Sequence, residues 1–391
     1  MLDNQEYIER CKHFTKEVIS RWYRKYEKLN SFPEEIHKDA HEWNLMNAGF
    51  PKELGGHGIS HAALAQGGVE MARVCAPTAF SLGFNHGTLR PILREGTKWQ
   101  KQVFIRDLLE DNKYASWCMT ESETSGTNLT AIKTRAMKVK DGWVINGKKV
   151  MTGNGSAASL FLVLADAWEG DRRIGLSIFA VPKTHEIDVG TNPDKLGFRC
   201  LPTPDITFNE VFVSDKHVIG APGAGFPILV DSLDYMRFGG GIITLGIATG
   251  ALDDLLPWLE SRKVYGGERL SERSHPQIQI GRILGQMTSL EVLVLHVASL
   301  LDQGKQIGRE SASVKLVGSE LAIKTTDIVM QLHGWRGTDA RFHIEKRFRD
   351  ARETAIYEGT NEILAMNIFR RRLQEHRLST PTERAHNNDK M

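Results

Sequence analysis

The apolar positions of this 391-residue chain change their spacing twice along the sequence. From residue 5 to about residue 112 they recur every three or four residues, which is the period of an amphipathic helix. The clearest run is Ala63, Leu64, Gly67, Gly68, Met71 and Ala72. Pro51 and the glycine-rich segment 54–58 interrupt this stretch and indicate turns between helices. We therefore predict an N-terminal α-helical domain over residues 1–112.

Between residues 113 and 225 the helical period gives way to short apolar runs separated by turn signals. The run Trp143-Val144-Ile145 lies between Asp141-Gly142 and Asn146-Gly147, two pairs that favour tight hairpin turns. Further short apolar runs cover residues 160–165, 176–181 and 206–213. Runs of this length and spacing predict a middle β-sheet domain of barrel-like form.

Long helical patterns return after residue 225. Four of them are long enough to cross a bundle, over residues 242–259, 281–301, 311–334 and 361–378. They predict a C-terminal four-helix bundle over residues 226–378, and the polar stretch 379–391 predicts a flexible tail. The expected fold class is α+β, with an N-terminal α-helical domain, a middle β-sheet domain and a C-terminal four-helix bundle.

Composition narrows the classes of function. Acidic and basic residues nearly cancel, at a formal net charge of +2, so the charge does not indicate a nucleic-acid partner. The basic run Arg370-Arg371-Arg372 lies in a stretch with helical apolar spacing, and we interpret it as a solvated helix face. The first twenty residues contain no apolar core of a signal peptide, and no stretch approaches membrane-spanning length. We expect a cytoplasmic protein without a membrane partner.

Cysteine spacing gives no sign of a metal site. The four cysteines, at positions 11, 75, 118 and 200, are widely scattered. The sequence contains neither a Cys-x-x-Cys motif nor a Cys/His cluster, so we predict no metal ligands and no disulfide framework.

The candidate chemistry lies near the C-terminus, in the segment Ile356-Tyr357-Glu358-Gly359-Thr360-Asn361-Glu362-Ile363. Gly359 permits a positive φ angle, and Thr360 or Asn361 is a suitable cap for the helix that follows. A carboxylate at such a break can be aimed into a cavity, and Glu358 is our candidate base. The alternative, a surface glutamate beside a helix cap, explains the same residue types equally well.

Further motifs match one family when they are taken in order. They are Pro51 to Gly58, Trp117-Cys118-Met119-Thr120-Glu121 with Ser125 to Asn128, Lys195 to Arg199, Phe208 to Val213, Gly223 to Phe226, Arg262 to Gly266, Gln331 to Gly334, and Tyr357 to Thr360. With this set the chain resembles the acyl-CoA dehydrogenases from about residue 40 to residue 375. Each motif is weak alone, but their common order makes the resemblance specific.

The resemblance implies both the reaction and the cofactor. Members of this family remove hydrogen from the α and β carbons of an acyl thioester, and because no side chain accepts hydride they use FAD. By resemblance Glu358 abstracts the α proton and flavin N5 accepts the β hydride. An apolar acyl pocket is expected to raise the pKa of the Glu358 carboxyl. The Glu358 backbone N–H and a flavin ribityl hydroxyl are implied donors to the thioester oxygen, worth on the order of 3 kcal/mol each.

The same resemblance assigns the substrate channel. It places Asp234, Arg237, Tyr357 and Gly359 at the substrate. A subset of the family carries its base one residue before an arginine of the first bundle helix, but here that position is Met236, which cannot abstract a proton. The alternative for Asp234 and Arg237 is an ion pair within the helix, at i and i+3.

Cofactor contacts are implied as well. The residues assigned to FAD are Trp117, Met119, Thr120, Thr127, Met151, Thr152, Arg262, Gln331, Gly334, Thr360 and Glu362. Of these, Arg262, Gln331 and Gly334 would come from a neighbouring subunit, with the arginine donating to pyrophosphate oxygens. The alternatives are that Arg262 is an ordinary surface arginine and that Gln331 is a helix-cap partner. A shared site implies a homodimer or homotetramer, and the family's usual electron acceptor is an electron-transfer flavoprotein.

Several departures limit what is carried over. Met151 stands where the family usually has a flavin-side tryptophan, and Gly153 takes the place of a hydroxyl unless Thr152 replaces it. A methionine shields a ring less rigidly than an aromatic residue does. These changes leave open a substrate whose acyl group is shorter, polar or bound to a carrier protein, and dioxygen as the electron acceptor. The alternatives are a divergent flavoprotein with oxidase or elimination chemistry, and a non-redox binding subunit on the same scaffold.

Overall fold

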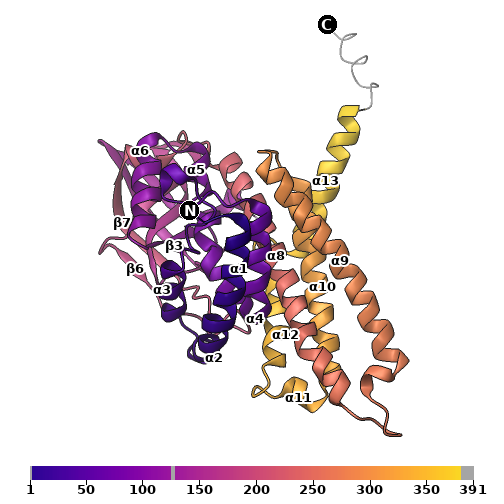
Figure 1. The fold of residues 1–391 in the computed structure, drawn as a ribbon. Coiled ribbons are helices and arrows are strands. Elements are labelled where there is room, and N and C mark those ends of the chain that lie inside the picture. The colour runs from indigo at the N-terminus through magenta and orange to yellow at the C-terminus, as the bar shows by residue number, and fades with distance from the viewer. Residues whose placement is uncertain (1, 125–127, 380–391) are drawn as a thin grey trace, which may run out of the picture.

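The computed structural model describes residues 2–124 and 128–379, and Figure 1 shows a helical part, a sheet and a helical bundle in chain order. The helices of the first part are α1 (Asn4–Phe14), α2 (Ser20–Leu29), α3 (Glu34–Glu42), α4 (His61–Thr88), α5 (Arg90–Glu95), α6 (Lys98–Lys101) and α7 (Asp107–Glu110). Short π-helical segments, Thr15–Ile19 and Gln102–Arg106, and a 3-10 turn, Lys52–Leu54, connect some of them.

Helix α4 bends in its middle. Cys75 has non-helical backbone angles, φ −146° and ψ 96°, two residues before Pro77. Proline removes a backbone donor and clashes with the preceding turn, so a kink at this point has a direct cause. The bend gives the second half of α4, residues 79–88, a direction of its own, and this half forms one wall of the site described below.

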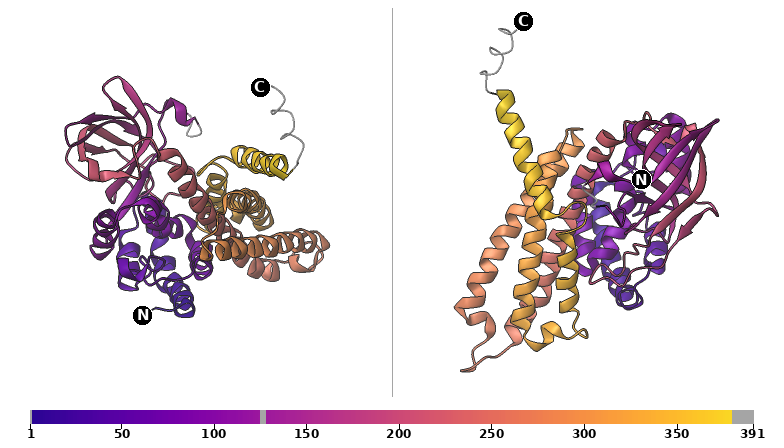
Figure 2. Two further views of the ribbon diagram at one scale, coloured as in Figure 1. Left: turned by 90° about the horizontal axis from the view of Figure 1, so that it is seen from above. Right: turned by 180° about the vertical axis from the view of Figure 1, so that it is seen from behind.

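The middle part is one sheet. Its strands are β1 (Tyr114–Cys118), β2 (Arg135–Val139), β3 (Gly142–Lys149), β4 (Ala158–Glu169), β5 (Arg172–Pro182), β6 (Ile187–Val189), β7 (Ile206–Ser214) and β8 (Val218–Ile219). The order is β6-β7-β3-β2-β4-β5-β8, and β1 also pairs with β4. Among the described residues no pairing joins β6 to β8, so the curved sheet seen in Figure 2 does not close into a barrel.

Strand β4 is covered on both faces, which explains its continuous apolar run. Leu160, Leu162 and Leu164 pack into a core shared with the α5–α7 region. The alternate residues Phe161 and Val163 pack into a second core inside the curved sheet. A strand buried on both faces loses the apolar–polar alternation that marks a half-exposed strand.

The last part consists of α8 (Gly225–Ser261), α9 (Ser274–Asp302), α10 (Gly308–His333), α11 (Trp335–Thr338), α12 (Ile344–Thr354) and α13 (Asn361–Ser379). The predicted helices 311–334 and 361–378 agree with α10 and α13 within three residues, whereas α9 begins seven residues before the predicted 281 and α8 begins at Gly225, well before the predicted 242. Its first half contains Gly239-Gly240-Gly241, which weakens the helical pattern. Helix α12, rich in charged residues, was also not predicted from the apolar pattern. Helix α13 ends the described chain, so residues 380–391 of the expected tail lie outside the described residues.

Helices α8 and α9 are long and apolar enough to cross a membrane by length and composition alone. Two thirds of the apolar window of α8 is buried inside the protein, as expected for the central helix of a bundle. The window of α9 is only 28% buried, and this helix lies on the outside of the bundle in Figures 1 and 2.

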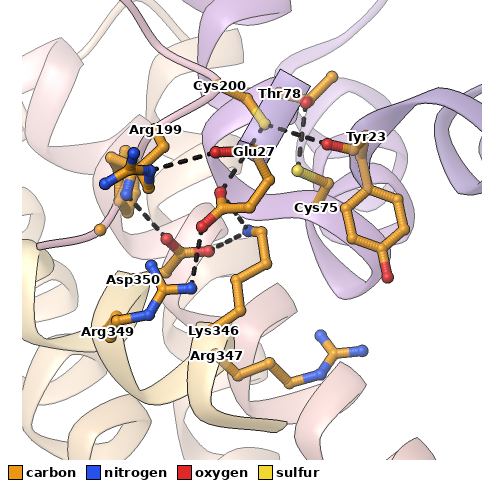
Figure 3. A network of polar contacts seen from close by, with 12 residues as sticks. Tyr23, Glu27, Cys75, Thr78, Arg199, Cys200, Lys346, Arg347, Arg349 and Asp350 are labelled. Atoms are coloured by element: carbon orange, nitrogen blue, oxygen red, sulfur yellow. Dashed lines mark hydrogen bonds and ion pairs between the residues drawn. The ribbon is translucent and has the colours of Figure 1, made fainter. Parts of the chain in front are cut away.

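A buried polar network joins the three parts, and Figure 3 shows it from close by. Glu27 on α2 accepts from Arg349 of α12 at 2.9 Å, and its backbone carbonyl accepts from Arg199 of the β6–β7 connection at 3.1 Å. Lys346 pairs with Asp350, whose other carboxylate oxygen accepts from the Phe198 amide at 2.8 Å. Because each buried charge has a partner, the network fixes α12 against the other two parts.

Candidate active site

Glu358 lies in the turn between α12 and α13, and its backbone is unusual. Glu358 has φ +56° and the following Gly359 has φ +101°. A left-handed conformation is uncommon for a glutamate, and two such residues in succession reverse the chain direction sharply. The Ile356 amide still donates to Glu353 at 3.0 Å, whereas no described residue accepts from the Glu358 amide. The turn therefore presents a carboxylate and a free peptide N–H together.

An apolar cavity opens beside this turn, with an empty volume of about 880 Å³ that includes some open solvent. Glu358 is its only carboxylate among the described lining residues. The walls come from the loop before α4, both halves of α4, and α8, and even Tyr7 of α1 contributes. Met236 of α8 lines the cavity too, which leaves an apolar side chain at the position of the alternative base. The cavity suits the hydrocarbon part of a ligand.

Burial changes the acidity of Glu358. Both carboxylate oxygens are buried, and neither has a hydrogen-bond partner among the described residues. Burial raises the pKa of the Glu358 carboxyl to about 8, against the smaller opposing effects of Lys315 and Arg237. A carboxylate with a pKa near neutrality is better matched to removing a proton from carbon than an exposed one.

Two cations, from α10 and α8, hold the turn through its backbone carbonyls. The Lys315 ammonium of α10 donates to the Gly359 carbonyl at 2.8 Å, and Arg237 of α8 donates to the Glu358 carbonyl at 3.1 Å. Burial lowers the pKa of Lys315 to about 8, although Glu358 opposes this change. Neither cation bonds the carboxylate itself, so the backbone is fixed while the two oxygens stay unpaired.

Asp234 and Arg237 form the ion pair that was the alternative for them, at 2.9 Å. The pair is part of a larger contact, because Asp234 also binds Arg371 of α13 at 3.1 Å. Arg371 therefore does not lie on the solvated helix face that was predicted for the basic run 370–372. The three side chains connect α8 and α13 next to the Glu358 turn.

Tyr357 packs against aromatic side chains. Its ring lies 5.2 Å from that of Phe80 and 5.3 Å from that of Phe198. The Phe198 amide donates to Asp350, which belongs to the polar network of Figure 3. The Lys315 ammonium lies 5.7 Å from the Tyr357 ring centroid. Burial raises the pKa of the Tyr357 hydroxyl well above its usual value. These contacts fix the residue immediately before Glu358.

The predicted flavin-side residues form two adjacent segments. Met119 and Thr120 follow β1, Met151 and Thr152 follow β3, and the Val150 amide donates to the Thr120 carbonyl at 2.8 Å. Met151 is half exposed with φ +55°, whereas the Thr152 hydroxyl is buried without a partner among the described residues. Met151 therefore presents the side chain on this surface, and Thr152 faces inward. The indole N–H of the predicted Trp117 is buried in the same way.

Phe84 connects this surface to the cavity of Glu358. A Cβ added to Gly153 would lie 2.5 Å from the Phe84 ring, so Phe84 fills the space that a side chain at position 153 would need. Phe84 also lines the cavity. Phe84 therefore lies between position 153 and the cavity of Glu358, and the exposed Met151 side chain two residues earlier offers an apolar surface that fits a planar ring such as a flavin.

The other predicted cofactor residues lie elsewhere. Arg262 ends α8 and Gly334 follows α10, and the two ends are joined by a hydrogen bond of 2.9 Å from Trp258 to the Leu332 carbonyl. Gln331 is exposed at the same end of the bundle. Thr360 and Glu362 lie beside the Glu358 turn, where a hydrogen bond from the Glu362 backbone and a second one from Thr360 lower the pKa of the Glu362 carboxyl. Thr127 lies outside the described residues.

Lys315 and Phe84 were missed by the sequence reasoning. Lys315 is fully buried, and its signal was a lysine inside the small and apolar stretch 312–317 of a predicted helix. Phe84 carries no comparable signal, since an aromatic residue on a helix most often belongs to the core. Within residues 2–124 and 128–379, no group of three or more histidine, cysteine, aspartate or glutamate side chains could hold a metal ion.

A buried, unpaired carboxylate beside an apolar cavity is suited to an enzyme that takes a proton from a weakly acidic carbon. Comparisons with known proteins identify the family. The chain matches the acyl-CoA dehydrogenase N-terminal domain over residues 3–112, the middle domain over 116–211 and the C-terminal domain over 223–373. It is 31% identical over 369 residues to the short-chain specific acyl-CoA dehydrogenase of Rattus norvegicus, covering 94% of this chain and 89% of the relative.

Two solved structures are similar over nearly their whole length. Butyryl-CoA dehydrogenase from Megasphaera elsdenii superposes with a TM-score of 0.90 at 26% identity, covering 95% of this chain and 98% of that one. A chain in a structure described as the electron transferring flavoprotein of Acidaminococcus fermentans gives the same four values. The present chain therefore belongs to the acyl-CoA dehydrogenase family, which uses FAD. It is a flavoprotein oxidoreductase that catalyses acyl-CoA dehydrogenation, as its motifs implied.

Proposed function

We propose that this enzyme introduces an α,β double bond into an acyl-CoA with Glu358 as the base that removes the α proton. The observation that carries the proposal is a buried carboxylate that lacks hydrogen-bond partners, lines an apolar cavity and has its pKa raised to about 8. Such a group is costly to bury, and a structural role would have supplied it with donors.

The chain's own residues then act in three ways. The apolar walls exclude water and keep the Glu358 carboxylate reactive. Arg237 and Lys315 hold the carbonyls of residues 358 and 359, which fixes the direction of the base. The free Glu358 amide would donate to the thioester oxygen and stabilise the charge that develops there as the α proton leaves.

FAD, when bound, supplies the acceptor for the β hydride. We assign its ring to the surface made by Met119, Thr120 and Met151, beside Phe84. Thr360 and Glu362 lie next to the base and are assigned to the same cofactor. The inward position of Thr152 and Trp117 supports contacts through their backbone in place of their side chains.

Arg262, Gln331 and Gly334 would hold the pyrophosphate end of FAD in a neighbouring subunit. Helix α9 supports such an assembly, because Ile278, Leu284 and Val292 expose large apolar side chains on it. An apolar helix face of this length is more stable when another protein surface covers it than when it faces water. The predicted homodimer or homotetramer follows from a cofactor shared in this way.

Coenzyme A is the carrier that the relatives support, since the rat and Megasphaera proteins are named for acyl-CoA and butyryl-CoA. An electron-transfer flavoprotein stays our proposed acceptor. The cytoplasm stays our proposed location, although the rat relative is named as mitochondrial.

Flavin absorbance tests this function directly. We expect the purified protein to be yellow and to bleach when an acyl-CoA is added without oxygen. Glu358→Gln should keep its FAD and lose the bleaching, whereas full bleaching in that variant would remove Glu358 from the reaction. A colourless wild-type protein that binds no added FAD would favour the non-redox scaffold.

A further inference from the structure

A buried chain of hydrogen bonds reaches the helix that forms one wall of the cavity. His37 of α3 and the Ser81 hydroxyl of α4 lie 2.8 Å apart, and that hydroxyl donates to the Asn154 side-chain oxygen at 2.7 Å. The Asn154 side-chain nitrogen donates in return to the Ser81 carbonyl at 3.0 Å. All three side chains are almost fully buried. The chain therefore joins α3, α4 and the segment that follows β3.

The direction of each proton in this chain follows from the groups themselves. The Ser81 carbonyl can only accept, so it fixes the orientation of the Asn154 amide. The Ser81 hydroxyl then donates to the Asn154 oxygen and accepts from the His37 Nε2–H. Burial lowers the His37 pKa well below its usual value, and its Nδ1 is buried without a partner in the part of the chain that the structure describes. His37 is therefore a neutral ring with a fixed donor at Nε2.

The last member of the chain belongs to the segment that we assign to the flavin. Asn154 has φ +56° and lies three residues after Met151, which has φ +55°. Left-handed backbone at two non-glycine residues is costly and needs support. The Asn154 amide donates to the Pro202 carbonyl at 2.9 Å, and the Gly153 carbonyl accepts from the Ser116 hydroxyl at 2.8 Å. These bonds support the segment from the β domain.

Support from α4 depends on Ser81. Among the hydrogen bonds of the described residues, the two between Ser81 and Asn154 are the only ones that join α4 to segment 150–155. Ser81 precedes Phe84 by three residues, so both side chains lie on the same face of the helix. Phe84 leaves no room for a side chain at Gly153 and also lines the cavity. One face of α4 thus contacts both the cavity and the segment that carries Met151.

We propose that His37, Ser81 and Asn154 are positioning residues that hold segment 150–155 against α4, and so set the distance between the flavin and an acyl group in the cavity. The inference rests on the proposed function and adds the residues that align its two reactants. Hydrogen bonds suit this task better than apolar contacts, because they have a preferred length and direction. Transfer of hydride requires close approach of the reacting atoms, and a displacement of about 1 Å is already costly.

The test separates donation from packing at His37. His37→Phe keeps an aromatic ring beside Phe32, whose ring centroid lies 4.2 Å away, but loses the donor, whereas His37→Gln keeps an N–H group near the position of Nε2. Ser81→Ala removes the middle of the chain. Ser232→Ala is the matched control, because Ser232 is a fully buried serine of α8 whose hydroxyl donates within its own helix, to the Ile228 carbonyl at 3.1 Å.

Four quantities are measured on each FAD-loaded protein. They are the visible circular dichroism of the bound flavin, the rate of anaerobic bleaching at saturating butyryl-CoA, the half-saturating concentration of butyryl-CoA, and Tm. We expect Ser81→Ala and His37→Phe to change the flavin spectrum and to slow bleaching about tenfold, with the half-saturating concentration within about twofold of wild type. His37→Gln should restore the spectrum and the rate, and Ser232→Ala should lower only Tm.

Three results would overturn the inference. They are an unchanged spectrum and rate in Ser81→Ala and His37→Phe, an equal loss in Ser232→Ala, and a His37→Gln protein as slow as His37→Phe, which would assign His37 a packing role. If Ser81→Ala does not fold, the two His37 variants decide the question. A wild type that binds FAD but that no acyl-CoA bleaches would overturn the proposed function instead, and the flavin spectra of the variants would still decide this inference.

Discussion

Replacing Glu358 by glutamine should stabilise the protein, and the gain should grow with pH. In the folded chain the Glu358 pKa is about 8, whereas an unfolded glutamate has its ordinary value near 4.5. Between these values the folded state keeps a proton that the unfolded state has lost, so the unfolding free energy of the wild type falls as pH rises. Glutamine has a similar shape and no charge, and it removes this dependence.

The size of the effect follows from the same two values. Between the two pKa values, each pH unit changes the difference in unfolding free energy between variant and wild type by about 1.4 kcal/mol. From pH 5 to pH 8 the change is therefore about 4 kcal/mol. An unfolding entropy of about 2.1 cal/mol/K per residue converts this difference into about 5 °C in Tm for a chain of this length. Above pH 8 Lys315, with its pKa lowered to about 8, also loses its proton, and the window ends.

Thermal unfolding of both FAD-loaded proteins at half-unit pH steps measures the difference. Glu362→Gln is the control, because this exposed carboxyl has a lowered pKa and stays ionised in both states above pH 5. Its Tm difference from wild type should be constant from pH 5 to pH 8. A constant difference for Glu358→Gln as well would refute the burial argument, since a group that titrates normally gives no slope in this range.

Of three other predictions, two concern Glu358 and Lys315, and one concerns a buried ion pair of the middle domain. The rate of flavin bleaching should rise with pH toward about 8, because only the ionised Glu358 accepts a proton; a flat profile in anaerobic stopped-flow would contradict this. Lys315→Met should move that midpoint upward by about one pH unit, and Lys315→Arg should restore it; an unmoved midpoint would limit Lys315 to a structural role. Glu121→Gln should lower the unfolding free energy by about 3 kcal/mol in thermal or urea unfolding, because Lys149 is fully buried against it at 2.9 Å, and an unchanged stability would show that the lysine finds another partner.

Much of the architecture was predictable because local patterns decide it. Apolar spacing and turn pairs, which are local features of the sequence, predict the strands β3 and β7 and the helices α9, α10 and α13. Helix α8 was predicted too short, because its glycines weaken the pattern, and only packing against α4 and α10 reveals why they are there. The middle domain is a β-sheet as expected, and its barrel-like form is that of a curved sheet whose described strands leave it open.

The sequence by itself determined the family, through the order of its motifs, and the candidate for the base, a glutamate between a tyrosine and a glycine. What only the tertiary structure decided is the environment of that glutamate. Its carboxylate oxygens are buried without partners among the described residues, and the cations that hold its backbone come from α8 and α10, helices distant in sequence. Acidity depends on burial and neighbouring charge, and cavity width depends on how helices approach, so no local stretch of the chain determines either quantity.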